Sequence, residues 1–279
     1  MAKELFNNGT HRCIVFDDIM SDAGVISGDV QSNQFLITNT TGKNYEEGLI
    51  FDPGGSKLVS HLHKELARYI PTNRIKKIVL SHQDPDTGAG ITQWLMMTST
   101  TTKIYVSALW VRFVPHFSRN DIKDEVFVAV PDQGMKIGLN GCNIYMIPAH
   151  FIHSPGNFQL YDPMSKILFS GDLGTSLLPK KGVMNEVENF EDHIKHMEGF
   201  HKRYLSANRA CRLWADMVRE LDIEMIVPQH GTKYFKGKAM VRKFIDWIGN
   251  LECGADILSD NLYKSCGRTI LVKEGQLTR

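Results

Sequence analysis

Four short segments of this 279-residue chain place imidazole or carboxylate side chains directly after an apolar run. Imidazole nitrogens and carboxylate oxygens are common ligands of transition metals. Side chains at strand ends stand on rigid stems beside loops. The pattern therefore predicts a dispersed site for two metal ions. The six candidate ligands are His82, Asp84, Asp86, His153, Asp172 and His230.

Each segment also has a purely structural interpretation. In HQDPDT, either Asp86 or Thr87 could cap a helix that begins near Gly88. On an extended loop, however, His82, Asp84 and Asp86 alternate and can face the same way. Two carboxylates beside one imidazole are costly without a cation. The other three segments could be plain polar turns, but four such strand ends together favour the metal site.

The elements that must position these residues are read from apolar periodicity and turn residues. We expect helices over residues 56–70 (capped by Ser56 and ended by Pro71), 88–97, 108–113, 192–220 and 237–251. Apolar runs bounded by Gly, Asn and Asp predict strands. These runs are RCIVFDD, NQFLITN, GLIFDPG, IKKIVLS, TKIYVS, EVFVAV, MKIGL, CNIYMIP, FQLYD, KILFS and IEMIVPQ.

Strands in both halves with helices between them favour an α/β (α+β) fold of two face-to-face sheets with helices outside. A doubly wound parallel sheet is the competing fold, but it predicts stricter alternation than residues 125–170 show. It also predicts a phosphate loop, and Gly54-Gly55 lacks that spacing. Without a low-complexity linker, we expect one domain over residues 1–279 with a helical part from about 190 to 279.

Composition narrows the class of protein. A hydrophobic content of 42% can form a substantial core, and a net charge of +1 offers no field for nucleic acid or an anionic membrane. No apolar run approaches the roughly 18 to 20 residues that span a bilayer, and the first residues lack a signal core. Five scattered cysteines without a CxxC pair indicate reduced thiols. We expect a soluble cytoplasmic protein.

The order of these motifs resembles the metallo-β-lactamase superfamily, a four-layer αββα sandwich with metals at the end of its sheets. The family's HxHxDH, a His before a turn, a bridging Asp and a final His match HQDPDT, HSPGN, GDLG and PQHG. Asp52 in IFDPGG matches an early strand-end Asp that would hydrogen-bond to the site. The resemblance covers nearly the whole chain.

Two departures from that motif indicate a branch of the superfamily. Asp84 replaces the second His, which resembles the flavodiiron pattern HxExDH and favours iron or manganese over tetrahedral zinc. Thr87 replaces the last His, which would be a ligand of the second metal ion (metal 2), and would leave that ion with an open position. By this resemblance, metal 1 would take His82, Asp84 and His153, metal 2 would take Asp86 and His230, and Asp172 would bridge them.

Two groups of histidines remain outside this set. His150, three residues before His153, could supply the missing nitrogen or hydrogen-bond to a ligand, and we favour the second role. The segment EDHIKHMEGFH holds a single ExxH, whereas a ferritin-like di-iron bundle needs two. We therefore expect a solvated helix face there, which by the resemblance would lie near the entrance of the site.

Flavodiiron proteins reduce oxygen or nitric oxide with electrons from a following flavodoxin domain, and this chain ends at Arg279 without a phosphate loop. We therefore expect no FMN.

The chain resembles the stand-alone oxygen-binding di-iron proteins. That resemblance implies two non-heme iron ions (Fe2+/Fe3+), O2 bound as a peroxo-type adduct, and oxygen sensing through a partner protein. Alternatives are an O2 or NO reductase supplied by a separate redox partner, and a metal-dependent hydrolase. Homodimerisation is left open.

Overall fold

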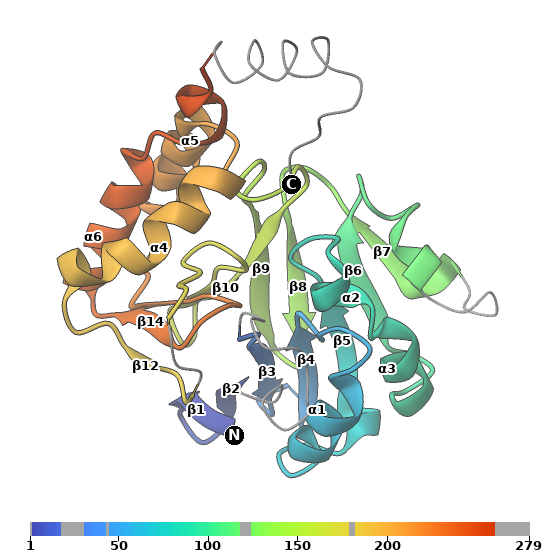
Figure 1. The fold of residues 1–279 in the computed structure, drawn as a ribbon. Helices are drawn as coiled ribbons and strands as arrows, with labels where there is room; N and C mark the ends of the chain where they lie inside the picture. The colour runs from blue at the N-terminus through green and yellow to red at the C-terminus, as the bar shows by residue number, and fades with distance from the viewer. Residues whose placement is uncertain (1, 18–30, 43–44, 118–123, 179–181, 260–279) are drawn as a thin grey trace, which may run out of the picture.

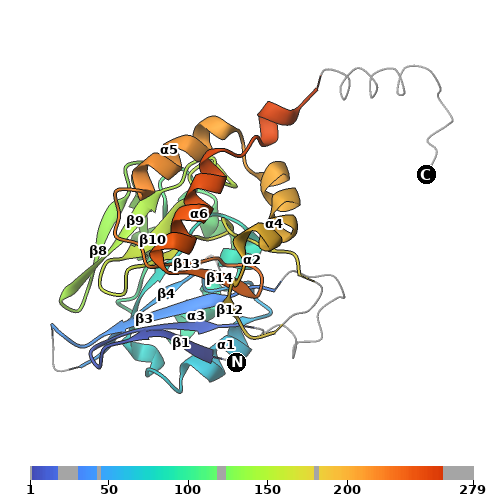
Figure 2. The ribbon, with the colours of Figure 1, turned by 90° about the vertical axis from the view of Figure 1, so that its left-hand side faces the viewer.

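The computed structural model describes residues 2–17, 31–42, 45–117, 124–178 and 182–259. Two seven-stranded sheets lie face to face, with helices on both outer faces (Figure 1). The view from the side shows the layers in turn, from α1 and α3 through the two sheets to α4, α5 and α6 (Figure 2). The four-layer αββα sandwich predicted from the sequence is confirmed.

The first sheet contains the N-terminal strands in chain order, β1-β2-β3-β4-β5-β6-β7. Its first four strands are antiparallel, and β4 to β7 are parallel, as expected where helices connect the strands. The strands are β1 (Ala2–Asn7), β2 (His11–Phe16), β3 (Gln34–Asn39), β4 (Glu47–Phe51), β5 (Ile75–Val79), β6 (Lys103–Ser107) and β7 (Phe127–Val130).

The second sheet has the order β12-β14-β13-β11-β10-β9-β8. Within it, β8 to β11 form an antiparallel meander, and β11 pairs in parallel with β13. The strands are β8 (Met135–Leu139), β9 (Cys142–Pro148), β10 (Phe158–Asp162), β11 (Ile167–Phe169), β12 (Asn185–Glu186), β13 (Met225–Val227) and β14 (Lys233–Lys236).

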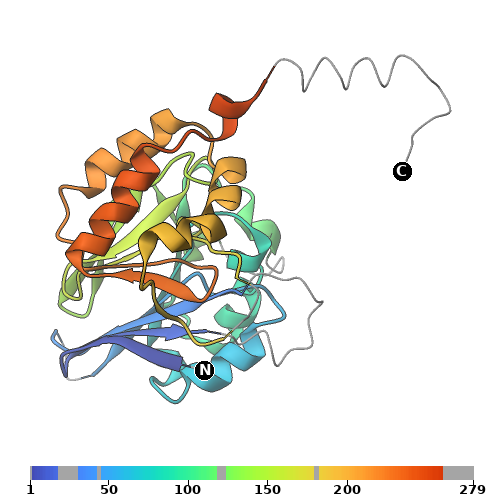
Figure 3. The same cartoon turned by 60° about the vertical axis from the view of Figure 1, so that its left-hand side comes forward.

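Helices pack on the outer face of each sheet. Leu62 of α1 and Trp94 of α3 are fully buried against the first sheet. Figure 3 shows α4, α5 and α6, in orange to red, along the outside of the second sheet. None of the described helices has the length and apolar composition needed to cross a membrane. The helices are α1 (Val59–Leu66), α2 (Pro85–Gly88), α3 (Ile91–Met97), α4 (Phe190–Tyr204), α5 (Asn208–Val218) and α6 (Lys238–Gly249), with short 3-10 turns η2 (Thr72–Arg74), η3 (Val114–Phe117), η4 (Asp124–Val126) and η5 (Gly254–Ile257).

The core between the sheets is aromatic and aliphatic. The rings of Phe35, Phe51 and Phe169 are fully buried, and the Phe35 and Phe169 centroids lie 4.9 Å apart across the sheets. Every residue of β3 and β4 is buried because a sheet covers one face and helices cover the other. The apolar residues of these two strands, 35–37 and 49–51, are therefore consecutive in the sequence and do not alternate with polar ones.

Several predicted boundaries are wrong. The helix expected over 56–70 spans only Val59–Leu66, and its N-cap is Leu58, without a side-chain cap from Ser56. Residues 108–113 form turns instead of a helix. Within them, the Trp110 indole donates to the carbonyl of Pro155 at 2.8 Å. Strands β1, β12 and β14 were not predicted. Strand β12 is a two-residue polar strand at the edge of its sheet, and β14 is a four-residue strand of mixed sequence.

The single helix expected over 192–220 is two helices. Leu205 and Ala207 have extended backbones, so α4 ends at Tyr204 and α5 begins at Asn208. The break is held from outside the helix, because the amide of Ala255 donates to the carbonyl of Ser206 at 2.7 Å. Local periodicity cannot report this distant partner.

A buried polar cluster joins the two sheets far from the predicted ligands. His11 Nε2 of β2 lies 2.8 Å from Asp162 Oδ2 of β10, and the thiol of Cys13 donates to the same oxygen at 3.3 Å. His11, Cys13 and Asp162 are fully buried. Burial alone would lower the pKa of His11, but its hydrogen bonds, first to Asp162, raise it to about 12. The cluster therefore contains an ion pair inside the core.

We predict that Asp162→Asn lowers the free energy of unfolding by about 3 to 5 kcal/mol, because it leaves the His11 charge buried without its partner. Folding raises the His11 pKa from 6.5 to about 12, so its stabilisation is complete below pH 6.5 and is lost as pH rises through 12. Urea unfolding between pH 6 and 9 should show a downward slope in the wild type that is weaker in the variant. Asp222→Asn is the matched control, because its ion pairs with Lys166 and Lys238 are exposed to solvent and should contribute little to stability. Equal losses in both variants would contradict the role of the buried pair.

Candidate metal centre

Three of the predicted ligands lie at the same position relative to their strands. His82 follows the last residue of β5 by three residues, and Asp172 and His230 follow the ends of β11 and β13 by three residues each. Because β11 and β13 are parallel and in register, the loops after them leave the sheet together. The two sheets thus bring these side chains to one end of the sandwich.

One group of side chains gathers around Asp84. Its Oδ2 lies 3.5 Å from His82 Nε2 and 3.2 Å from His153 Nε2. One donor atom from each of the three residues lies within 4.8 Å of the others, a spacing that can hold a metal ion. His82 and Asp84 come from the first sheet and His153 from the second, so this position spans both sheets.

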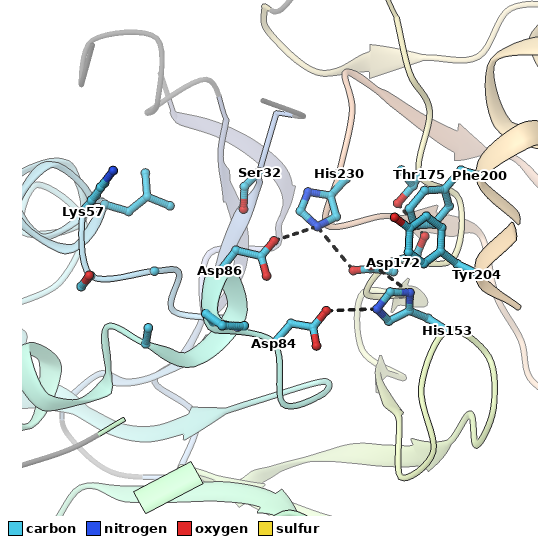
Figure 4. Close-up of a pocket in the computed structure, with 15 residues that line it drawn as sticks. Ser32, Lys57, Asp84, Asp86, His153, Asp172, Thr175, Phe200, Tyr204 and His230 are labelled. Carbon is cyan, nitrogen blue, oxygen red and sulfur yellow. Dashed lines mark hydrogen bonds and ion pairs between the residues drawn. The ribbon is translucent and has the colours of Figure 1, made fainter. Parts of the chain in front are cut away.

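A second group gathers around His230. Its Nε2 lies 3.3 Å from Asp86 Oδ2 and 3.5 Å from Asp172 Oδ1. Asp172 also faces the first group, with 3.8 Å from Oδ1 to His82 Nε2 and 3.4 Å from Oδ2 to His153 Nδ1. Figure 4 shows its carboxylate between the two histidines, opposite Asp84 and Asp86. The structure therefore brings all six predicted residues together in two groups, with Asp172 shared.

The backbone between the two aspartates differs from the extended loop that we predicted. Asp84 is extended and is the N-cap of α2, while Asp86 lies in the first turn of that helix. Pro85 is the first helical residue, where its missing N–H costs nothing. The alternative interpretation, in which Asp86 or Thr87 would cap the helix, is therefore wrong, because Asp84 is the N-cap. The turn directs Asp84 to one group and Asp86 to the other.

Behind His82 lies a buried chain of hydrogen bonds. The amide of Ser81 donates to Asp52 Oδ1 at 2.7 Å, and Ser81 Oγ lies 2.7 Å from His82 Nδ1. Burial raises the pKa of Asp52 to about 7 against the opposing charge of His82. Asp52 has a left-handed backbone (φ 51°), so the turn after β4 points it at this loop. It fixes the ring of His82 through Ser81 and does not touch it directly.

Thr87 has a polar partner of its own. Its buried hydroxyl accepts a hydrogen bond from Gln229 Nε2 at 3.1 Å, and Gln229 immediately precedes His230. This bond ties α2 to the loop after β13. The threonine thus links the two segments that carry Asp86 and His230.

His150 has partners away from the two groups. Its Nε2 lies 2.8 Å from the carbonyl of Asp132, and its ring meets Phe158 edge to face. It lines a separate hollow beside α5. This placement does not support the expectation that His150 hydrogen-bonds to a ligand, and we assign it no part in the site.

Helix α4 supports the site in a way that the sequence did not reveal. The imidazole of His201 is fully buried, donates from Nδ1 to the carbonyl of Met197 and accepts the amide of Gly174 at Nε2. Burial lowers the pKa of His201 to about 4, so the ring stays neutral and can accept. Gly174 is two residues after Asp172, so His201 holds the loop of that carboxylate.

The same helix covers the site from outside. Phe200 stacks on the ring of His153 with an interplanar angle of 7°, and Tyr204 lies over it at 5.6 Å. Both aromatic residues line a pocket of about 520 Å3 together with Asp84, Asp86 and other predicted ligands. The expectation that this helix face is only solvated is wrong for His193 and His201, which are buried. The sequence could not predict the role of His201, because a single histidine in a helix has no characteristic spacing to other ligands.

The charges of the site fit a cation. Burial would raise the pKa of Asp172, but His230 and His82 outweigh it and hold the pKa below its usual range. Burial likewise opposes the charge of His82, yet the carboxylates of Asp172 and Asp84 raise its pKa to about 9. Two buried acceptor atoms facing the site, Asp172 Oδ1 and His153 Nδ1, have no hydrogen-bond partner. Three carboxylates and three imidazoles around such orphaned atoms fit two hard or borderline metal ions.

The chain is similar to known proteins in sequence and in fold. A model of the "ODP family beta lactamase" matches residues 30–231. A structure of the peroxy diiron species of chemotaxis sensor ODP is 39% identical, covering 92% of this chain and 97% of that chain with a TM-score of 0.77. The apo state of chemotaxis sensor ODP from T. denticola is 38% identical over the same shares, with a TM-score of 0.78.

More distant structures share the fold alone. A flavo di-iron protein mutant from Thermotoga maritima is 18% identical, and the match covers 89% of this chain and 60% of that chain, with a TM-score of 0.70. No curated protein sequence matches the chain. Because the family model spans most of the chain and the similar sensor structures are aligned over nearly their whole length, this chain belongs to the ODP family of beta-lactamase-fold proteins.

Proposed function

We propose that this chain is an oxygen-binding di-iron protein that acts as an oxygen sensor. The observation that carries the proposal is the carboxylate of Asp84 in contact with both His82 and His153, because it makes the donor set oxygen-rich. The similarity to a chemotaxis sensor with a peroxy diiron species supports the same reading. The sensor would report to a partner protein, and the free thiols of Cys13, Cys211 and Cys253 agree with a cytoplasmic location.

In this proposal the six side chains would hold two iron ions, and the iron would supply the binding of a diatomic gas. His82, Asp84 and His153 would hold one ion, and Asp86 and His230 the other. Asp172 would bridge them, since its two oxygens face both groups. Thr87, already engaged by Gln229, would leave the second ion one protein ligand short.

The residues around the six ligands control which molecules can reach the metal centre. Phe200 and Tyr204 present ring faces over His153 and limit the water that can approach it. His201 and Asp52 hold the backbone behind the ligands, so the site is rigid before a gas enters. Among the described pocket residues, Lys57 offers the only ammonium, and it is exposed.

Anaerobic purification followed by controlled oxygenation tests this function. We expect about two iron ions per chain, as six protein ligands allow, and a visible absorption band that appears with oxygen and disappears when oxygen is removed. Rapid conversion to a stable diferric spectrum that consumes supplied electrons would favour the reductase. Bound zinc without any spectral response would contradict both the oxygen sensor and the reductase and would favour the hydrolase.

The bridging role of Asp172 predicts a distinct iron count. Asp172→Ala should remove both metals, because its carboxylate faces both groups and its loss leaves the imidazoles without their shared counter-charge. His230→Ala should remove only the second metal and leave about one iron per chain. Iron analysis of the anaerobically purified variants distinguishes the two. Full retention of iron in Asp172→Ala would refute the bridge.

The role of His201 predicts a weaker site without any lost ligand. His201→Phe leaves the amide of Gly174 without an acceptor and frees the Asp172 loop, so we expect iron affinity to fall by about 10- to 100-fold. His201→Gln can still accept that amide and should restore part of the affinity. His193→Phe is the control, because His193 is buried in the same helix but has no partner at Nε2. Equal losses in His193→Phe and His201→Phe, measured by anaerobic iron titration, would show a general packing effect instead.

A further inference from the structure

A chain of two hydrogen bonds ends on Asp84, one of the residues of the first group. Gln83 donates from Nε2 to Asp84 Oδ1 at 3.0 Å. At the other end of the same amide, Gln83 Oε1 accepts the hydroxyl of Ser154 at 3.0 Å. Gln83 is half-buried and Ser154 is buried, so both bonds are partly protected from water. We call this chain of Ser154, Gln83 and Asp84 the Gln83 bridge.

The two oxygens of Asp84 face different partners. Oδ2 lies 3.5 Å from His82 Nε2 and 3.2 Å from His153 Nε2. Oδ1 accepts the hydrogen bond from Gln83. In Figure 4, one oxygen of Asp84 is on the dashed line to His153 and the other points away from it. The bond from Gln83 therefore limits rotation of the carboxylate and keeps Oδ2 beside the two imidazoles.

The Gln83 bridge also joins loops from the two sheets. Gln83 lies between His82 and Asp84 in the loop after β5, and Ser154 directly follows His153 in the loop after β9. The bridge thus connects the segments that carry all three residues of the first group. A glutamine amide suits this place because it both donates and accepts, whereas a carboxylate only accepts and an ammonium only donates.

The bond from Gln83 also acts on the charge of Asp84. An N–H group that donates to a carboxylate ligand reduces the negative charge that the ligand gives to its metal. Hydrogen bonds to the ligands and net charge are among the factors that set the reduction potential of an iron site. Less negative charge on a ligand favours ferrous over ferric iron. The Gln83 bridge therefore favours the reduced state of an ion held beside Asp84.

We propose that Gln83 is a positioning residue of the metal centre, which holds Asp84 with Oδ2 toward the ion and raises the reduction potential of the iron. This role rests on the proposed function where it concerns iron, because a reversible oxygen sensor needs ferrous iron before oxygen arrives. Ser154 supports the role by fixing the amide of Gln83 in the orientation that donates to Asp84.

The positioning role is tested first with cobalt(II), without iron or oxygen. The metal-free wild type and its variants are titrated with cobalt(II), and binding is followed by visible absorption. We expect Gln83→Leu to weaken binding by about 10- to 100-fold, because leucine fills the space but leaves Asp84 Oδ1 without its donor. Ser154→Ala should cause a smaller loss, since Gln83 keeps its bond to Asp84 but loses its own partner.

The effect on charge is tested with the iron-loaded protein by anaerobic redox titration, followed by electron paramagnetic resonance. Gln83→Leu should lower the midpoint potential, because Asp84 recovers the negative charge that Gln83 withdraws. Gln83→Lys should raise it, because the ammonium can still donate to Asp84 and adds a positive charge. A side chain that only fills space would not move the two potentials in opposite directions.

Gln93→Leu is the matched control, because Gln93 is exposed on α3 and its amide donates to the carbonyl of Ser56, which is not a ligand. Equal cobalt(II) losses in Gln93→Leu and Gln83→Leu would contradict the positioning role, as would potentials that shift the same way in the leucine and lysine variants. An oxygen band in the wild type, with affinity and potential unchanged in Gln83→Leu, contradicts this role alone. Weaker cobalt(II) binding in Gln83→Leu, when the wild type shows no oxygen band, contradicts the proposed function and leaves the positioning role.

Discussion

The buried carboxylate of Asp172 is the constraint around which this molecule is built. It lies 3.4 to 3.8 Å from imidazole nitrogens of His82, His153 and His230, which belong to three separate loops. A carboxylate this deep is tolerable only when cations or positive imidazoles surround it. The two sheets must therefore end together, and α4 must hold the loop of Asp172 from behind through His201.

Local sequence predicted the parts of the fold that depend on local periodicity. The runs IKKIVLS, KILFS and IEMIVPQ were expected as strands, and their ends deliver His82, Asp172 and His230. The break between α4 and α5 was missed because it depends on Ala255, about fifty residues away. Strand β14 was missed because its pairing with β13, not its short mixed sequence, makes it a strand.

The residues of the site also fall into those that the sequence could predict and those that it could not. Residue type and order were enough to bring six side chains to attention, because the chemistry of a ligand is carried by the residue itself. The residues that hold these ligands in place could not be recognised from residue type and order. His201 acts through one backbone amide, and Thr87 through the side chain of Gln229. Such partners are set by tertiary contact, and His150 shows the reverse error, since closeness in sequence to His153 did not place it at the site.

Tertiary contacts also explain how the loop that carries His153 keeps its strained backbone. His153 needs a left-handed backbone to turn its ring between Asp84 and Asp172, and Phe151 two residues earlier shares that conformation. The strain persists because Ser206 and the α4 aromatics hold the loop from the other side. The loop that carries His153 is therefore held on one side by the carboxylates of Asp84 and Asp172 and on the other by the aromatic rings of α4. The charges of the site and the packing of α4 together fix its conformation.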